Sequence, residues 1–208
     1  MLAADDAAAW SAFSPSAQAY KVLIPGTPQE ETVFQDGQNV QVVTADGELP
    51  NGLFFMVITM EIPQKGSIQR REDALQFLAG AVESYHKRPG VQVLETSEIE
   101  LGKIPGRQVI ADGFQGNKVR ARHYAVGTQS YCLMAQSGDL ELLNSDRAAK
   151  FFDSFELLNL PAEPLSEHSR AYDLGRMAGA AICNAAIVVT VIVVLFGFLR
   201  RRKRGSTP

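Results

Sequence analysis

The sequence predicts an α+β fold, an antiparallel β-sheet sandwiched by helices, followed by one C-terminal transmembrane helix. Residues 53–60 form a nearly continuous apolar run, which is typical of a central strand covered on both faces. Four further strand patterns lie in residues 91–136, the last three separated by turn signals at 116–117 and 127–128. Residues 177–199 are uncharged and as a helix would span about 34 Å, more than the roughly 30 Å of a bilayer core.

These patterns divide the chain into a globular domain and a membrane anchor. At 208 residues the chain has room for one domain of ordinary size and an appendage. The expected parts are an N-terminal tail (1–9), the domain (10–158), a linker with two prolines (159–176), the transmembrane helix (177–199) and a basic tail (200–208).

Within the domain, alternating apolar residues predict strands at 20–24 and 40–42, before the central run. Glu72 and Asp73 favour the N-terminus of an amphipathic helix, which Pro89 and Gly90 end. Its apolar stripe is made of Leu75, Leu78, Val82 and Tyr85. The four later strands read as an antiparallel meander.

A closing helix is expected to begin near Ser145, which is a suitable N-cap residue. Ala148, Phe152 and Phe155 would lie on one face of this helix. The chain then leaves the domain through residues 156–158.

The anchor also predicts an orientation in the membrane. Residues 200–204 are consecutive cations, so by the positive-inside rule this end is cytoplasmic and the domain lies outside the cytoplasm. Export normally requires an apolar signal segment, whereas residues 1–10 include Asp5 and Asp6 and no such stretch. Two interpretations stay open: an exported domain at the cell membrane, which we favour, and a tail-anchored protein whose domain faces the cytosol.

Small residues in and before the apolar segment raise the question of a homodimer. Gly175, Gly179 and Cys183 recur every four residues, and Asn184 beside them could form an interhelical hydrogen bond. The alternative is that these small residues face lipid, and the sequence does not decide between the two.

The charge and the cysteine content of the chain argue against nucleic-acid binding and against a disulfide framework. Outside the basic run the chain has 15 basic and 23 acidic residues, a formal charge of about −8. A net acidic domain repels phosphate backbones, so we expect no nucleic-acid binding. Cys132 and Cys183 are the only cysteines, one in a predicted strand and one in the apolar segment, which implies no disulfide framework.

A cysteine and a histidine meet in the predicted meander. If two-residue turns set the register, His123 lies opposite Cys132 and Asp112 is diagonal to His123, while Tyr124 lies opposite Tyr131 on the other face. Cysteine, histidine and aspartate are the members of a nucleophilic triad. Catalytic cysteines usually lie at turns or helix N-termini, whereas Cys132 is in mid-strand, where a small apolar residue packs. We therefore expect no catalytic residues and no enzyme, with a thiol-dependent enzyme using Cys132 and His123 as the alternative.

Other charged groups give weaker signals. Arg120 and Arg122, with Arg107 nearby, could hold an anionic ligand, but a solvated or internally paired strand face is the interpretation we favour. His86 resembles a cation at a helix C-terminus and His168 lies in the linker, so the histidines and cysteines lack zinc-ligand spacing. The sequence also lacks glycine-rich nucleotide motifs and hydrolase signatures. We expect no metal and no cofactor.

Four segments together resemble the PsbP-like superfamily. They are W-x-x-F-S-P at 10–15, Y-K-V-L-I-P-G-T-P at 20–28, I-P-G-R at 104–107 and F-F-D-S-F-E-L at 151–157. The resemblance covers about 10–158 and is greatest to the uncharacterised bacterial, membrane-anchored branch. It implies an α/β/α sandwich and a non-enzymatic interaction role, and no functional residue can be carried over. We expect a single-pass membrane protein that presents this domain to a protein or envelope partner.

Overall fold

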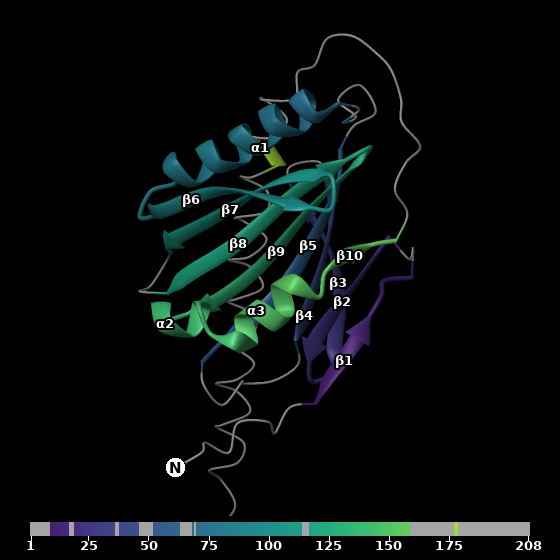
Figure 1. Ribbon diagram of the computed structural model, residues 1–208, viewed down its shortest axis with the longest axis vertical. Helices are drawn as coiled ribbons and strands as arrows, with labels where there is room; N and C mark the ends of the chain where they lie inside the picture. Colours follow the sequence, from purple (N-terminus) through teal and green to yellow (C-terminus); the bar gives the residue numbers. More distant parts are fainter. Residues whose placement is uncertain are drawn as a thin grey trace, which may run out of the picture.

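The computed structural model describes residues 9–16, 19–35, 38–45, 52–62, 68, 70–113, 117–158 and 177–178. In these residues a seven-stranded sheet and a three-stranded sheet, both antiparallel, are packed with three helices (Figure 1). The predicted α+β class with an antiparallel sheet is therefore confirmed.

The seven-stranded sheet has the order β3-β4-β5-β9-β8-β7-β6. Its strands are β3 (Pro28–Gln35), β4 (Gln38–Ala45), β5 (Phe54–Glu61), β6 (Gln92–Leu101), β7 (Ile104–Asp112), β8 (Lys118–Val126) and β9 (Gln129–Ser137). The apolar run predicted to be a central strand is β5, which lies between β4 and β9 and is buried on both faces. Strands β6 to β9 form the expected meander. Gly127, at φ 58°, makes the two-residue turn that pairs Val126 with Gln129.

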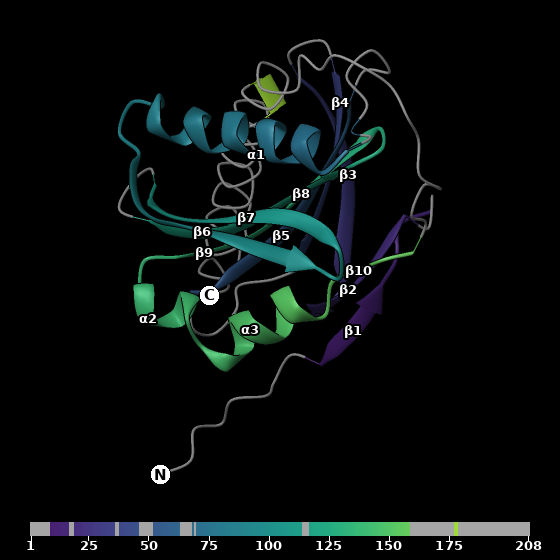
Figure 2. The ribbon, with the colours of Figure 1, turned by 45° about the horizontal axis from the view of Figure 1, so that its top comes forward.

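One face of the large sheet is covered by α1 (Arg71–His86), which crosses it over β7 and β8 (Figure 2). The helix begins where predicted, because the Asp73 carboxylate accepts a hydrogen bond from the Arg70 backbone N–H at 3.2 Å. His86 lies in the last turn of the helix, the position at which the sequence placed it. The core under the helix includes Ile58, Phe77, Val109 and Met134.

The opposite face is covered by a mixed layer of helices and strands (Figures 1 and 2). It consists of β1 (Trp10–Phe13), β2 (Tyr20–Pro25), β10 (Glu156–Leu157), α2 (Leu140–Leu143) and α3 (Asp146–Asp153). Strand β2 pairs with both β1 and β10, and its alternate residues Tyr20, Val22 and Ile24 enter the core. The expected helices are present in this layer, and β1 and β10 pair with β2 to form a second sheet beside them.

Helix α3 has the predicted N-cap. The Ser145 hydroxyl accepts a hydrogen bond from the Ala148 backbone N–H at 3.4 Å, and Ala148 and Phe152 are buried. Phe155 is buried too, but it follows the helix end. At that end the Ser154 hydroxyl accepts a hydrogen bond from the Leu23 backbone N–H at 2.9 Å. This bond ties α3 to β2.

The predicted anchor lies almost entirely outside the described residues. So do residues 1–8, the linker 159–176, the basic tail 200–208, and Gly175, Gly179, Cys183 and Asn184. Of the apolar segment, Met177 and Ala178 are described, and Ala178 is buried against the core beneath α1. In the described part of the chain, no helix has the length and apolar character needed to cross a membrane.

Candidate functional site

The β8–β9 hairpin brings His123 and Cys132 together in the core beneath α1. Their strand positions are paired as predicted, and the Cys132 Sγ lies 3.8 Å from the His123 Nε2. The Tyr85 hydroxyl, on α1, lies 3.0 Å from the same nitrogen. Cys132 is 0% exposed and His123 is 2% exposed. Two groups therefore approach a single buried imidazole nitrogen.

Burial also decides the charge of this histidine. Desolvation of the ring lowers the pKa of His123 from 6.5 to about 4, so the imidazole is neutral at pH 7. A neutral imidazole gives a neighbouring thiolate no stabilising positive charge. The pair has the geometry of a hydrogen-bonded core cluster rather than of an activated nucleophile.

The third member of the predicted triad is not at this cluster, so the placement of Asp112 was wrong. Asp112 pairs with Lys118, and the residue of β7 opposite His123 is Arg107. The prediction assumed a two-residue turn at 116–117. Instead the Gly113 N–H donates to the Asn117 carbonyl at 2.6 Å, which closes a longer loop and shifts the register.

The arginines of β8 lie on the opposite face of the sheet, against α3. Arg120 and Arg122 both donate through Nε to the Gln108 side-chain oxygen, at 3.0 and 3.2 Å. Each guanidinium lies 5.0 Å from the Phe152 ring, and Arg122 also contacts the Asp153 carboxylate at 2.8 Å. These contacts agree with an internally paired strand face.

Arg107 does not join these arginines, which corrects the expectation that it lies near them. Its strand position pairs with His123, so its side chain is on the α1 face of the sheet. There it contacts the Glu98 carboxylate at 2.8 Å. The register shift of β7 against β8 explains this change of face as well.

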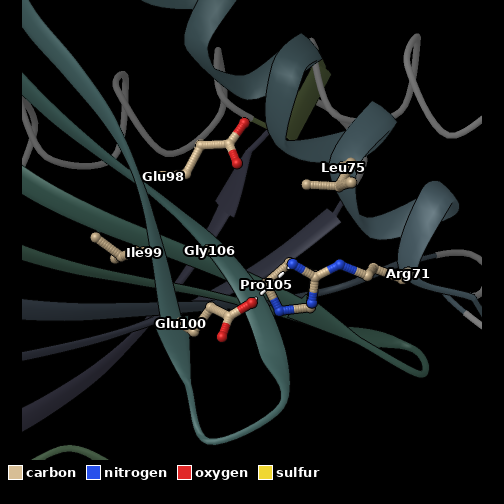
Figure 3. A pocket seen from close by; sticks show the side chains of 7 residues that line it. All are labelled: Arg71, Leu75, Glu98, Ile99, Glu100, Pro105 and Gly106. Carbon is tan, nitrogen blue, oxygen red and sulfur yellow. Dashed lines mark hydrogen bonds and ion pairs between the residues drawn. The ribbon is translucent and has the colours of Figure 1, made fainter.

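A cleft of about 280 Å³ opens beside this ion pair, between the N-terminal half of α1 and the β6–β7 hairpin. It is lined by Arg71, Leu75, Glu98, Ile99, Glu100, Pro105 and Gly106. Figure 3 shows Glu98 and Glu100 projecting from β6 toward α1, while Ile99 between them points away. The Arg71 guanidinium contacts the Glu100 carboxylate at 2.7 Å across the opening.

The two ion pairs leave the glutamates of the cleft accessible. Glu98 and Glu100 have side-chain exposures of 70% and 55%, and the Arg71–Glu100 pair, which is exposed on both sides, contributes at most about 1 kcal/mol. Leu75 supplies an apolar wall beside them. The cleft can therefore accept a cationic side chain with an aliphatic stem, at small cost to the domain.

Sequence reasoning did not single out these glutamates. The available signal was the alternation Glu98, Ile99, Glu100, Leu101, which places two carboxylates on one strand face. Only the position of α1 makes that face a cleft. In the described residues, no group of three histidine, cysteine, aspartate or glutamate side chains could hold a metal ion.

No protein-family model matches the sequence, and no curated protein matches it. Among solved structures, the chain is similar to cyanobacterial PsbP from Synechocystis, at 12% identity, with coverage of 76% of this chain and 98% of that one and a TM-score of 0.49. A Bacteroides thetaiotaomicron protein matches at 8% identity over 71% of this chain and 48% of its own, with a TM-score of 0.37. An uncharacterised Mycobacterium smegmatis protein matches at 16% identity over 85% and 86%, with a TM-score of 0.26. With identities of 16% or less and TM-scores below 0.5, these similarities assign neither a family nor a function.

Proposed function

We propose that this chain is a single-pass membrane protein of the PsbP-like kind, which presents a non-catalytic interaction domain outside the cytoplasm. The observation that carries the proposal is the uncharged segment 177–199 followed directly by the cations of 200–204. Leu158 is the last described residue before the expected linker, and its backbone N–H donates to the Ala19 carbonyl at 3.1 Å. Eighteen residues, 159–176, lie in the sequence between Leu158 and the proposed anchor, whose second residue, Ala178, is buried against the core beneath α1.

The proposal of a PsbP-like domain is supported by the structural positions of the four segments that resemble that superfamily. Trp10 packs on Phe55 with ring centroids 5.8 Å apart, and Gly26 turns the chain after β2 at φ 76°. Gly106 makes room for Tyr124, and the segment 151–157 supplies the end of α3 and β10. Each segment thus occupies a position that the domain's packing requires.

A non-catalytic role is supported by the surroundings of Cys132, the nucleophile that the alternative enzymatic role would use. Cys132 is buried beside a neutral histidine, away from the accessible cleft. The cleft itself is lined by two exposed glutamates, of which Glu100 is paired with Arg71 of the lining and Glu98 with the neighbouring Arg107. Surface ion pairs next to an open hollow are suited to recognition of a charged partner.

Cell fractionation tests the anchor. The wild-type chain should stay in the membrane pellet after an alkaline wash, whereas Val188→Arg with Val191→Arg should release it, because each central arginine costs about 2.5–3.5 kcal/mol. Ser206→Arg with Thr207→Arg adds the same charge beyond the segment, so this variant should stay in the membrane pellet. A wild-type chain found in the soluble fraction would overturn the proposal.

Protease treatment of intact cells tests the orientation. An exported domain is cut from outside, at a site in the linker 159–176, while a cytosolic marker protein survives. A domain that resists the protease until the membrane is permeabilised would instead be tail-anchored in the cytosol.

A further inference from the structure

Strand β6 ends the large sheet, and its outer backbone groups have no strand beside them in the described part of the chain. The strand is long, from Gln92 to Leu101, and its pairing with β7 is regular from Glu95 onward, after a register shift at Val93. Alternate residues of 95–101 therefore direct their N–H and C=O groups outward along this edge. Such an edge can pair with an added strand.

The glutamates on β6 determine what that strand could carry. Glu98 and Glu100 point to the α1 side, into the cleft, and Glu95 is exposed as well. Side chains of an added strand on the same face would lie beside these carboxylates, because adjacent strands are about 4.8 Å apart. Lysine or arginine at alternate positions would complement them, with the aliphatic stem against Leu75.

The same charges oppose pairing with a second copy of the chain. Two β6 edges would bring glutamates against glutamates, and the other edge strand, β3, carries Glu30 and Glu31. Like charges directly opposite each other destabilise a strand pair. The edge is thus protected from self-association while it remains open to a basic strand.

We propose that residues 95–101 of β6 pair with an extended segment of a partner protein that has basic residues at alternate positions, and that these enter the cleft to contact Glu98 and Glu100. This inference rests on the proposed interaction role of the domain and names the class of partner. The incoming cations replace the contact of Arg71, which is an exposed ion pair, and that of Arg107, whose side chain is half-buried.

The probe is a blocked synthetic peptide that alternates lysine and valine, titrated into the full-length chain in a neutral detergent. Calorimetry should detect binding at low salt that weakens as salt increases. The same peptide with glutamate in place of lysine should not bind. Glu98→Gln and Glu100→Gln should each weaken binding roughly fivefold. Glu31→Gln on β3 removes the same charge from the other edge and should leave binding unchanged.

Backbone methylation separates strand pairing from simple charge attraction. Methylating the lysine amides blocks one edge of the peptide strand, and methylating the valine amides blocks the other edge. One of these two peptides should lose binding and the other should keep it. The proposal would be overturned if both methylated peptides bound equally or if the lysine peptide did not bind at all. It would also be overturned if the glutamate peptide bound, or if both glutamine variants bound the lysine peptide as tightly as wild type.

The membrane anchor and the basic partner of β6 can be refuted independently of each other. Fractionation of cells reports on residues 177–199 alone, whereas the peptide titration reports on β6 in solubilised protein. Loss of peptide binding with normal membrane retention would refute the partner class and leave the anchor standing. Unchanged unfolding temperatures of the glutamine variants ensure that weaker binding comes from the cleft.

Discussion

Gly106 of β7 lies directly opposite Tyr124 of β8, and the tyrosine ring occupies the space that a side chain at residue 106 would need. A Cβ atom there would come within 2.5 Å of the ring carbon Cε1 and 2.9 Å of the His123 carbonyl oxygen. The ring in turn stacks on Phe155, with centroids 5.9 Å apart and planes inclined by 12°. The missing side chain therefore lets the sheet pack against the second layer.

Gly106→Ala should lower the free energy of unfolding by about 1–3 kcal/mol, because the added methyl group forces Tyr124 away from Phe155. Urea unfolding followed by circular dichroism measures the change. Gly138→Ala is the matched control, since a Cβ at that position meets nothing within 4 Å. Equal effects of the two substitutions would show that Tyr124 is free to move aside.

His123 should make the domain sensitive to acid. Its pKa is about 4 in the folded protein and about 6.5 when unfolded, so between these values the unfolded chain binds a proton that the folded chain does not. Its contribution to stability is complete above pH 6.5 and is lost as the pH falls toward 4, by on the order of 3 kcal/mol.

The variant His123→Gln isolates this effect. The unfolding free energy of wild type, measured from pH 7 to pH 4, should fall more steeply than that of the variant. Parallel curves for wild type and His123→Gln would mean that His123 binds its proton at the same pH in the folded and the unfolded protein.

Arg122 should stabilise the domain more by packing than by its ion pair. Its side chain is 17% exposed, whereas that of its partner Asp153 is 65% exposed. Arg122→Ala removes the contact with the Phe152 ring and the hydrogen bond to Gln108, which we expect to cost about 1–2 kcal/mol. Asp153→Asn removes only the exposed ion pair and should cost less than about 1 kcal/mol.

Repulsion between Arg120 and Arg122 supports the expectation that Arg122 stabilises the domain more by packing than by its ion pair. Burial, and then the charge of Arg122, lower the pKa of Arg120, so removing Arg122 also relieves an unfavourable interaction. The expected loss therefore comes from contacts rather than charge. If chemical denaturation shows Asp153→Asn to be as costly as Arg122→Ala, the ion pair provides most of the stability that Arg122 contributes.

The sequence was most informative where local chemistry determines the structure. Gly127-Thr128 is a two-residue turn, so the pairing of His123 with Cys132 could be predicted from the turn alone. The N-cap at Ser145 and the first turn of α1 are likewise local. The apolar run of β5 indicated its interior place in the sheet, because only a strand covered on both faces is apolar on both.

Prediction failed where distant contacts determine the structure. The β7–β8 connection contains a turn signal at 116–117, yet the strands pair around a longer loop, which moves Asp112 and changes the face of Arg107. Strand β3, with the sequence PQEETVFQ, has no alternation to identify it, and β10 is two residues long. Strand β3 forms because it pairs with β4, and β10 forms because it pairs with β2. The local sequence does not indicate which strand will be the partner.

The thiol of Cys132 should be inert in the folded protein, which is the sharpest test of the alternative enzymatic role. In a Cys183→Ala variant, Cys132 is the only cysteine, and its burial and the neutral His123 beside it should prevent reaction with a thiol reagent at pH 7. Labelling should appear in urea and follow the unfolding curve. Rapid labelling in native buffer would instead mean that the thiol is accessible and ionised, and would make the thiol-dependent enzyme the better interpretation of this domain.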